Sequence, residues 1–401
     1  MNEVIVRAVE RLVAMLIGAL SVYLGYRRAR SRSAHAYGGG PIFSGRTGGD
    51  SMTRVIILLS SIYLGLATST VAANSFAYMY DMRHLQQEKP RYEQRIGQLY
   101  RIITPLLSAQ ERQHLAGVRL EIPLIGAQSA TPLDFYTMGQ VGRATVFMPV
   151  LSLLFVEDLA TAFAWLQRHD YSLETVEEYV TMLRYKKASD FPGGRYPPPL
   201  KALHIPPEAM SNERVKTLAL ALRNEAYAFI LLHELGHVMH RHPDYNGISR
   251  ALTRQHEAEA DRFALTVLER ADTIPMGVIL WFMAQVNAMP SKGQRLAEKI
   301  VKSDTDWQEY LNMQATHPLT VERLSAIALD LNGWAKRAGA GNRHDVLVFI
   351  ASKLAYMAQG LDDPDLQGCM AVVAYRADPT TLVPRRHGAS IGGDLIRGSC
   401  E

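Results

Sequence analysis

Two long apolar runs precede any amphipathic pattern in the chain. The first, residues 12–26 (LVAMLIGALSVYLGY), is uncharged but shorter than the ~20 residues that a membrane-spanning helix needs. Apolar residues 4–6 extend it if the intervening charges reach the membrane surface or face a partner helix. The second, residues 55–80, is uncharged throughout and long enough to span. We therefore predict two transmembrane helices, at about residues 4–26 and 55–78.

Residues 27–54, which separate the two runs, are rich in Arg, Gly and Ser and predict a flexible loop. Arginines follow the first run directly, where the cleavage region of a signal peptide would be small and neutral. We therefore expect residues 1–80 to form an uncleaved membrane anchor, with a signal peptide as the alternative for the first run. Because arginines favour the cytoplasmic side, we expect the rest of the chain to lie outside the cytoplasm. The expected location is a bacterial inner membrane that the chain crosses more than once.

From residue 81 the chain shows the patterns of a globular domain. Periodic apolar positions predict helices over 88–116 (interrupted near Pro105), 156–168, 172–187, 211–242, 250–270, 276–289, 318–337 and 343–359. Residues 143–155 (RATVFMPVLSLLF) begin with β-branched and apolar residues and predict a strand. The expected fold class over residues 81–359 is therefore α+β, mostly helical, with a small sheet.

Two segments lack a regular pattern. Residues 188–210 are proline-rich, and we predict no regular structure there. The length of this segment between helices motivates the hypothesis of a lid over a cleft, with a surface excursion as the alternative. Residues 360–401 carry turn residues throughout and predict an irregular tail.

The amino-acid composition excludes some classes of function. Of the 401 residues, 48% are hydrophobic and 20% are charged, which suits a globular domain with a membrane segment. The net charge of +4 provides no broad basic field for nucleic acid. Only two cysteines are present, Cys369 and Cys400, which excludes a cysteine-rich metal site or a disulfide framework. They either pair in an oxidising compartment or remain two free thiols.

The segment FILLHELGHVMHRHP, on a predicted helix, contains the pattern H-E-x-x-H. A spacing of four places His233 and His237 one turn apart on one helix face, so both imidazoles can bind one metal ion. Glu234 is rotated by about 100° from His233 around the helix, which suits it to polarise a water beside the ion. The alternative is an amphipathic helix with surface histidines, and His240 and His242 just downstream resemble such residues.

A candidate third ligand, Glu257, lies in the run HEAEADRFAL of the next predicted helix. A reversal of the chain around residues 243–247 would return this helix alongside the first. Glu257 would then complete a site of two histidines and one glutamate with an open fourth position. Asp261, one turn further on, could accept the outer N–H of a ligand histidine and fix its tautomer. The alternative is an exposed acidic face paired with Arg254 or Arg262, but the spacing after H-E-x-x-H favours the ligand.

H-E-L-G-H followed by E-x-E-A-D is similar to the gluzincin metallopeptidases, particularly to the family of HtpX-type and CAAX-prenyl endopeptidases. The resemblance implies a gluzincin-like domain in which Glu257, and not Glu259, binds zinc while Asp261 supports the site. The family carries a further element, H-P-x-x-x-x-R, which this chain has from His317 to Arg323. By this resemblance His317 donates to the oxyanion of the tetrahedral intermediate, and Arg323 helps to hold the site together.

The expected function is a membrane-anchored, zinc-dependent endopeptidase with one Zn²⁺ per chain. Zn²⁺ held by His233, His237 and Glu257 would lower the pKa of its water, and Glu234 would pass the proton to the leaving amine. The strand predicted over 143–155 could pair with an extended substrate. Expected partners are a protein or peptide substrate and the lipid bilayer, in membrane or envelope protein quality control, with no nucleic acid.

The alternative function is a catalytically inactive, zinc-stabilised membrane scaffold or holdase. An intact Glu234 and an open fourth ligand position argue against it, since a structural zinc ion is usually closed by four protein ligands.

Overall fold

The computed structural model describes residues 76–127, 131–139, 142–243, 249–288, 321–362 and 384. The predicted transmembrane helices, apart from the end of the second, lie outside these residues, as do His317, Cys369 and Cys400. The end of the second run forms a short 3₁₀ helix, η1 (Phe76–Tyr78). Among the described helices, only α5 (Val150–Arg168) is long and apolar enough to cross a membrane, and most of it is buried within the protein.

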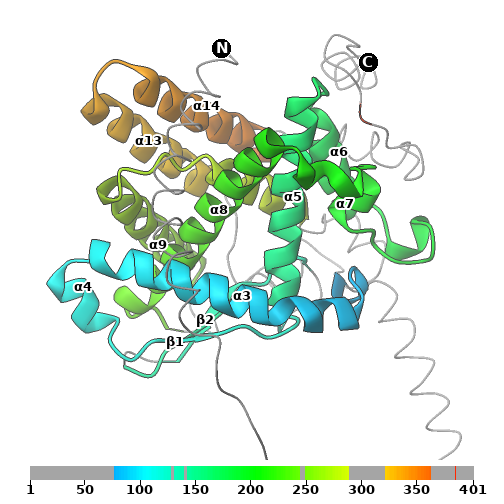
Figure 1. Ribbon diagram of the computed structural model, residues 1–401. Helices are drawn as coiled ribbons and strands as arrows, with labels where there is room; N and C mark the ends of the chain where they lie inside the picture. The colour runs from blue at the N-terminus through cyan, green and yellow to red at the C-terminus, as the bar shows by residue number, and fades with distance from the viewer. Residues whose placement is uncertain are drawn as a thin grey trace, which may run out of the picture.

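The described chain is mostly helical with one small sheet (Figure 1), which agrees with the expected fold class. The other α-helices are α3 (Met82–Ile103), α4 (Ala109–His114), α6 (Glu174–Tyr185), α7 (Pro199–Ala202), α8 (Glu213–Met239), α9 (Arg250–Arg270), α10 (Gly277–Ala288), α13 (Val321–Ala338) and α14 (Asn342–Asp362). The strands are β1 (Arg119–Glu121), β2 (Tyr136–Met138) and β3 (Thr145–Phe147). The remaining 3₁₀ helices are η2 (Thr104–Leu106), η3 (Ala188–Asp190) and η4 (Pro207–Ser211).

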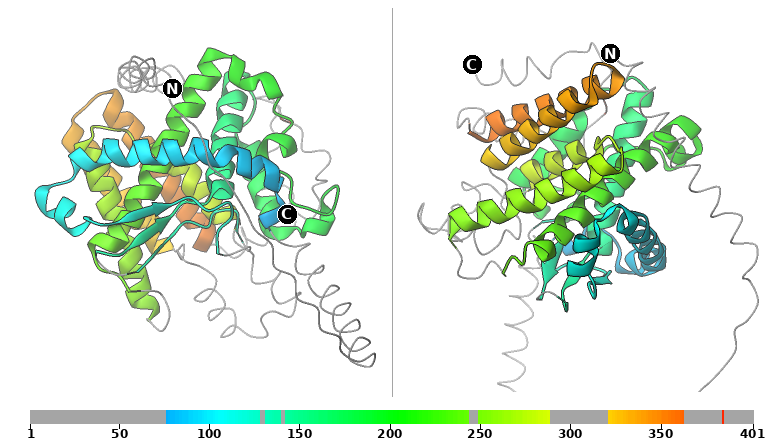
Figure 2. Two further views of the ribbon diagram at one scale, coloured as in Figure 1. Left: turned by 60° about the horizontal axis from the view of Figure 1, so that its bottom comes forward. Right: turned by 90° about the vertical axis from the view of Figure 1, so that its left-hand side faces the viewer.

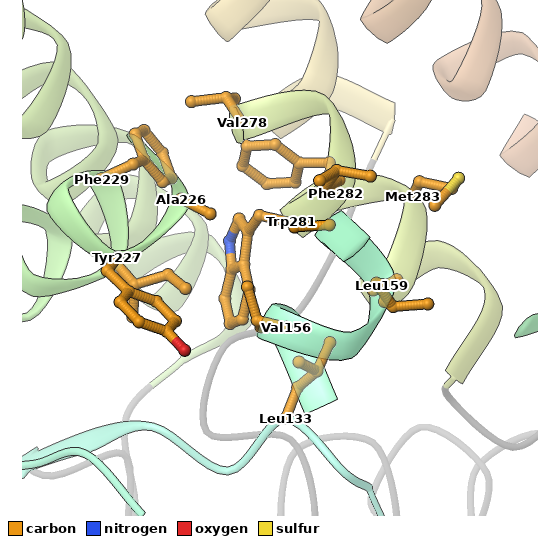
Figure 3. Close-up of a cluster of buried hydrophobic side chains, with 14 of the residues drawn as sticks. Leu133, Val156, Leu159, Ala226, Tyr227, Phe229, Val278, Trp281, Phe282 and Met283 are labelled. Carbon is orange, nitrogen blue, oxygen red and sulfur yellow. The ribbon is translucent and has the colours of Figure 1, made fainter. Parts of the chain in front are cut away.

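Helices α5 and α8 pack together at the centre of the molecule (Figure 1). Both are apolar around most of their circumference, as expected of helices that are covered on all sides. The short helix α10 packs against both and adds Trp281 and Phe282 to the core (Figure 3). The Trp281 ring meets Phe135 edge to face, and Phe282 meets Phe229 in the same way. Burial of each such ring stabilises the fold by roughly 1.5–3 kcal/mol.

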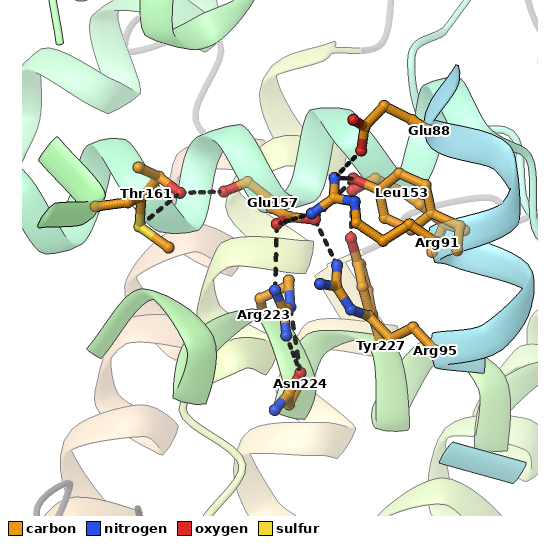
Figure 4. Close-up of polar contacts among 11 residues, drawn as sticks. Glu88, Arg91, Arg95, Leu153, Glu157, Thr161, Arg223, Asn224 and Tyr227 are labelled. Carbon is orange, nitrogen blue, oxygen red and sulfur yellow. Dashed lines mark hydrogen bonds and ion pairs between the residues drawn. The ribbon is translucent and has the colours of Figure 1, made fainter. Parts of the chain in front are cut away.

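A partly buried ionic network joins α3 and α8 to α5 (Figure 4). The carboxylate of Glu157 on α5 lies 2.9 Å from Arg91 and 2.7 Å from Arg95 of α3, and 3.2 Å from Arg223 of α8. Burial alone would raise the pKa of Glu157, but the three guanidinium groups outweigh it and lower the pKa to about 2. Glu157 is therefore ionised at neutral pH, and the network holds three helices in register.

The sheet has the strand order β1-β3-β2, with β1 parallel and β2 antiparallel to β3. In the right-hand view of Figure 2, the orange pair α13 and α14, then α9, then α8 and then the cyan strands follow one another as layers. Strand β2 contacts α8. Helices α8 and α9, which carry the histidine and glutamate candidates, thus lie between the sheet and the C-terminal helices.

The prediction of a strand over 143–155 is wrong for most of its length. Strand β3 ends at Phe147, Pro149 is the N-cap of α5, and the helix begins at Val150. Proline lacks the N–H that a ladder needs but is tolerated at a helix start. The apolar run after it belongs to a buried helix, which periodicity cannot distinguish from a buried strand. Strand β3 is also the central strand, so both of its edges are already paired.

The prediction that residues 188–210 lack regular structure is also wrong in part. Helices η3, α7 and η4 lie within this segment or at its end, and prolines begin the last two, because the fixed φ of proline suits the first helical position. The ring of Tyr196 stacks on Phe76 with centroids 4.1 Å apart, and Tyr179 donates to the Pro197 carbonyl at 2.8 Å. These contacts favour the alternative to a lid, an excursion packed on the body of the protein.

Candidate metal centre

Helix α8 supplies the two histidines of the site. Its N-cap is Asn212, whose side chain accepts from the backbone N–H groups of Arg214 and Val215, and its apolar surface is buried along most of its length. His233 and His237 lie on one face, as the spacing of four requires. Their Nε2 atoms are 3.1 Å apart, and both side chains are buried.

Helix α9 brings Glu257 to the same point. It packs along α8, and the two approach closely at Gly236, where a Cβ atom would lie 2.8 Å from Ala260 Cα. Glu257 is fully buried, with Oε2 3.5 Å from His233 Nε2 and Oε1 3.5 Å from His237 Nε2. The reversal between the two helices includes residues 244–248, which lie outside the described residues.

These three side chains fit a metal ion. Ligands of a tetrahedral ion with bonds of ~2.0–2.1 Å lie about 3.3–3.4 Å from one another. The two Nε2 atoms are 3.1 Å apart, and each lies 3.5 Å from a different oxygen of the Glu257 carboxylate, which is close to this spacing. Two imidazole nitrogens and one carboxylate oxygen form a donor set that binds divalent transition metals. His233, His237 and Glu257 could therefore hold a metal ion in a buried position.

Asp261 and Arg323 surround these ligands. Asp261 Oδ1 lies 2.8 Å from His233 Nδ1, on the side of the ring away from Nε2. Arg323 of α13 donates to both oxygens of Asp261, at 2.7 and 2.8 Å, and its Nη1 lies 2.7 Å from Glu257 Oε2. One buried guanidinium thus contacts two buried carboxylates, and it also lies over the Phe282 ring at 5.3 Å.

The electrostatics of the site favour positive charge on His233. Burial tends to raise the pKa of Asp261, but Arg323 and His233 lower it overall, so this carboxylate stays ionised. Burial tends to lower the pKa of His233, but Asp261 and Glu257 raise it above its usual value. The two carboxylates therefore stabilise a cation at the position of the His233 ring.

Glu234 faces the sheet. Its carboxylate is fully buried, and Oε2 accepts a hydrogen bond of 2.9 Å from the hydroxyl of Thr137 in β2. The same hydroxyl lies 3.2 Å from the carbonyl oxygen of Glu234. Thr137 was not predicted from the sequence, because it lies 97 residues before Glu234 and no local motif marks it.

Two further residues near the ligands were also missed. His242, interpreted from the sequence as a surface histidine, has its Nδ1 2.9 Å from Nδ1 of His237. Its Nε2 lies 2.8 Å from Glu259 Oε2. Nothing local in the sequence marks this placement, because it depends on the turn that follows α8.

A model of the Peptidase U49 family matches residues 167–341. The match indicates a peptidase family. It spans α8, α9 and Arg323, and so contains every residue of the described site except Thr137. No curated protein and no solved structure matches the chain.

Proposed function

We propose that this chain is a zinc-dependent endopeptidase of the gluzincin type, similar to the HtpX-type and CAAX-prenyl endopeptidases. The observation that carries the proposal is the convergence of His233, His237 and Glu257 within a span that matches a peptidase family. Three protein ligands, two of them imidazoles, are typical of catalytic zinc, whose fourth position stays open.

Different residues of the chain take different roles in the proposed hydrolysis of the peptide bond. A zinc ion at this site supplies Lewis acidity, which acidifies a water molecule and polarises a carbonyl group. Glu234, next to the ligands on α8, takes the proton of the attacking water and passes it to the leaving amine. Asp261 accepts the Nδ1–H of His233, which leaves the lone pair of Nε2 for the ion. Arg323 keeps Asp261 ionised and holds Glu257 in place.

His317 remains the proposed donor to the negative charge that develops on the carbonyl oxygen. The support for it is its place in the H-P-x-x-x-x-R element with Arg323.

Strand β2 replaces residues 143–155 as the proposed partner of an extended substrate. It is an edge strand, and within the described ranges no strand pairs with its outer edge. Its Thr137 contacts Glu234, so a peptide added to this edge would run past the base. Main-chain pairing to an exposed edge is a common mode of peptide recognition.

A substrate analogue tests this pairing. N-methylation of the amides flanking the scissile bond, one at a time, removes single main-chain donors. At least one such peptide should show a KM raised about tenfold, the equivalent of one hydrogen bond of ~1.4 kcal/mol. Unchanged KM for the whole set of methylated peptides would exclude pairing with β2.

We further propose that residues 1–80 anchor the enzyme in a bacterial inner membrane, with the peptidase domain outside the cytoplasm and acting in envelope protein quality control. The two uncharged runs and the arginines between them support this proposal. A reporter enzyme fused within the tail after residue 360 would report the side directly. If only a reporter that works in the cytoplasm is active, the orientation is the opposite of the one proposed.

Glu234→Gln tests the proposed reaction. The amide keeps the size of the side chain but cannot take a proton, so cleavage of denatured casein should fall by about 10²–10⁴-fold. Zinc content, measured by elemental analysis of detergent-purified protein, should remain that of wild type, because Glu234 is not a ligand.

A matched control is Glu213→Gln on the same helix, where the side chain is 79% exposed and pairs with the neighbouring Lys216; the activity of this variant should be unchanged. Wild-type cleavage by zinc-loaded Glu234→Gln protein would remove Glu234 as the base. Zinc-loaded wild-type protein that binds but never cuts casein, with or without chelator, would favour the scaffold alternative instead.

A further inference from the structure

The Nδ1 atoms of the two candidate ligand histidines contact different groups. His233 Nδ1 faces the carboxylate of Asp261 at 2.8 Å. His237 Nδ1 instead faces a second imidazole, that of His242, with 2.9 Å between the two Nδ1 atoms. His242 Nε2 in turn lies 2.8 Å from Glu259 Oε2, so a chain of contacts runs from His237 to a carboxylate that is 31% exposed.

The backbone after α8 is shaped to place His242 there. Arg241 has a φ of 57°, a left-handed conformation that non-glycine residues adopt only at a cost. The turn is closed by the His242 N–H, which donates to the His237 carbonyl at 3.0 Å, and by the Arg241 N–H, which donates to the Val238 carbonyl at 3.1 Å. This is the pattern that ends many helices, usually with glycine in the left-handed position. The reversal brings the His242 ring back over His237.

Helix α9 holds the other side of the His242 ring. His256 stacks on it with ring centroids 4.0 Å apart and an angle of 13°. Glu259 is itself fixed by Gln255, whose amide donates to Oε1 at 2.8 Å. His242 is therefore held by its own backbone, by a stacked ring and by a carboxylate, and its side chain is only 4% exposed.

The hydrogen positions follow from the chemistry of these groups. A carboxylate only accepts, so the contact with Glu259 requires a hydrogen on His242 Nε2. The two Nδ1 atoms can share only one hydrogen. If it belonged to His242, a neutral His237 would carry its hydrogen on Nε2 and could not bind a metal there. Metal binding therefore requires His237 Nδ1–H to donate to His242 Nδ1.

We propose that His242 and Glu259 are positioning residues that hold His237 in its metal-binding tautomer and orientation. The proposal rests on the proposed function only in requiring that the site binds zinc. It extends the usual carboxylate–histidine–metal arrangement by one imidazole. Loss of such an outer partner typically lowers metal affinity 10- to 100-fold.

Zinc affinity of the full-length, detergent-purified protein, measured by competition with a chromophoric chelator, tests the proposal. His242→Ala and His242→Phe should both bind zinc 10- to 100-fold more weakly than wild type. The phenylalanine ring preserves the stacking on His256 but has no acceptor. His242→Asn should recover part of the affinity, because its carboxamide oxygen can accept from His237 near the position of Nδ1. Glu259→Ala should cause a smaller loss.

His240→Ala is the matched control. His240 is exposed and stacks on His242 at 5.5 Å, and zinc affinity should be unchanged by its loss. Thermal unfolding without zinc checks that each variant folds; if His242→Ala does not, the Asn, Phe and Glu259→Ala variants decide the outcome. Wild-type affinity in His242→Phe, or no gain from Phe to Asn, would overturn the positioning role. Wild-type protein that holds no zinc at all would overturn the proposed function itself.

Discussion

Single polar contacts determine the charge balance and orientation of the buried groups around the candidate metal centre. Arg323 contacts the carboxylates of Asp261 and Glu257, so one positive charge offsets part of the negative charge that a buried site would otherwise leave uncompensated. The Thr137 hydroxyl holds Glu234 Oε2 at 2.9 Å. Both contacts join distant parts of the chain, and Thr137 can be substituted without changing the sequence of the helix that carries the histidines.

Thr137→Val removes the hydroxyl and keeps the shape of the side chain. Without this donor, the Glu234 carboxylate loses one of the contacts that fix its orientation, and a hydrogen bond to a charged group contributes roughly 1.5–3 kcal/mol. We expect kcat for casein-derived peptides to fall by about 10- to 100-fold, with KM and zinc content nearly unchanged. Thr137→Ser, which restores the hydroxyl, should recover most of the rate. Equal kcat values in the Val and Ser variants would show that the hydroxyl does not position Glu234.

At the scale of elements, the site depends on how closely α8 and α9 approach. Two of the candidate ligands come from α8 and one from α9, so the distance between these helices sets the separation of the donor atoms. Gly236 lies between the two histidines in the sequence and directly opposite Ala260 of α9. No side chain fits between the helices at this point.

Gly236→Ala should push the helices apart. The added Cβ would lie 2.8 Å from Ala260 Cα and 3.1 Å from its carbonyl oxygen, and both are backbone atoms that cannot move independently. We expect a loss of stability of about 1–3 kcal/mol and weaker zinc binding, because Glu257 withdraws from His233 and His237. Thermal unfolding and chelator competition measure the two effects.

Gly97→Ala on α3 serves as the control, since a Cβ there meets nothing within 4 Å. In the middle of a helix this substitution should stabilise by roughly 0.5–1 kcal/mol. If Gly236→Ala behaves like Gly97→Ala in both measurements, the close crossing of α8 and α9 does not determine the metal site.

For the whole molecule, buried carboxyl groups link stability to pH. Glu157 and Asp158 are neighbours on α5, but only Glu157 is surrounded by arginines. Asp158 accepts a hydrogen bond of 2.8 Å from Tyr80, and burial raises its pKa to about 8. Burial also raises the pKa of Glu225 to about 8. The folded protein therefore keeps protons at neutral pH that the unfolded chain releases near its ordinary carboxyl pKa values.

Asp158→Asn tests this linkage. A folded pKa near 8 against about 3.9 unfolded means that folding favours the protonated form, so the free energy of unfolding falls as pH rises from about 4 to 8. Each such group contributes a slope of at most about 1.4 kcal/mol per pH unit. Asparagine does not titrate, so the variant should gain stability relative to wild type as pH rises from 5 to 8. Thermal unfolding at several pH values measures this, and parallel curves for the two proteins would contradict it.

The local features of this protein could be predicted from sequence alone. His233 and His237 face one point because a helix of 3.6 residues per turn places positions four apart on one side. The helix predicted over 211–242 is observed as Glu213–Met239, with Asn212 as its N-cap. These features depend on near neighbours in the chain, so periodicity and capping residues reveal them.

The tertiary structure decided which distant groups complete the site. Thr137 reaches Glu234 across 97 residues, and His242 reaches His237 only because Arg241 adopts a left-handed conformation. The apolar run after Pro149 forms a buried helix, and the edge strand that contacts α8 is β2. A short apolar run carries the same pattern in either form, and side chains from separate elements meet only where packing sets the crossing of those elements.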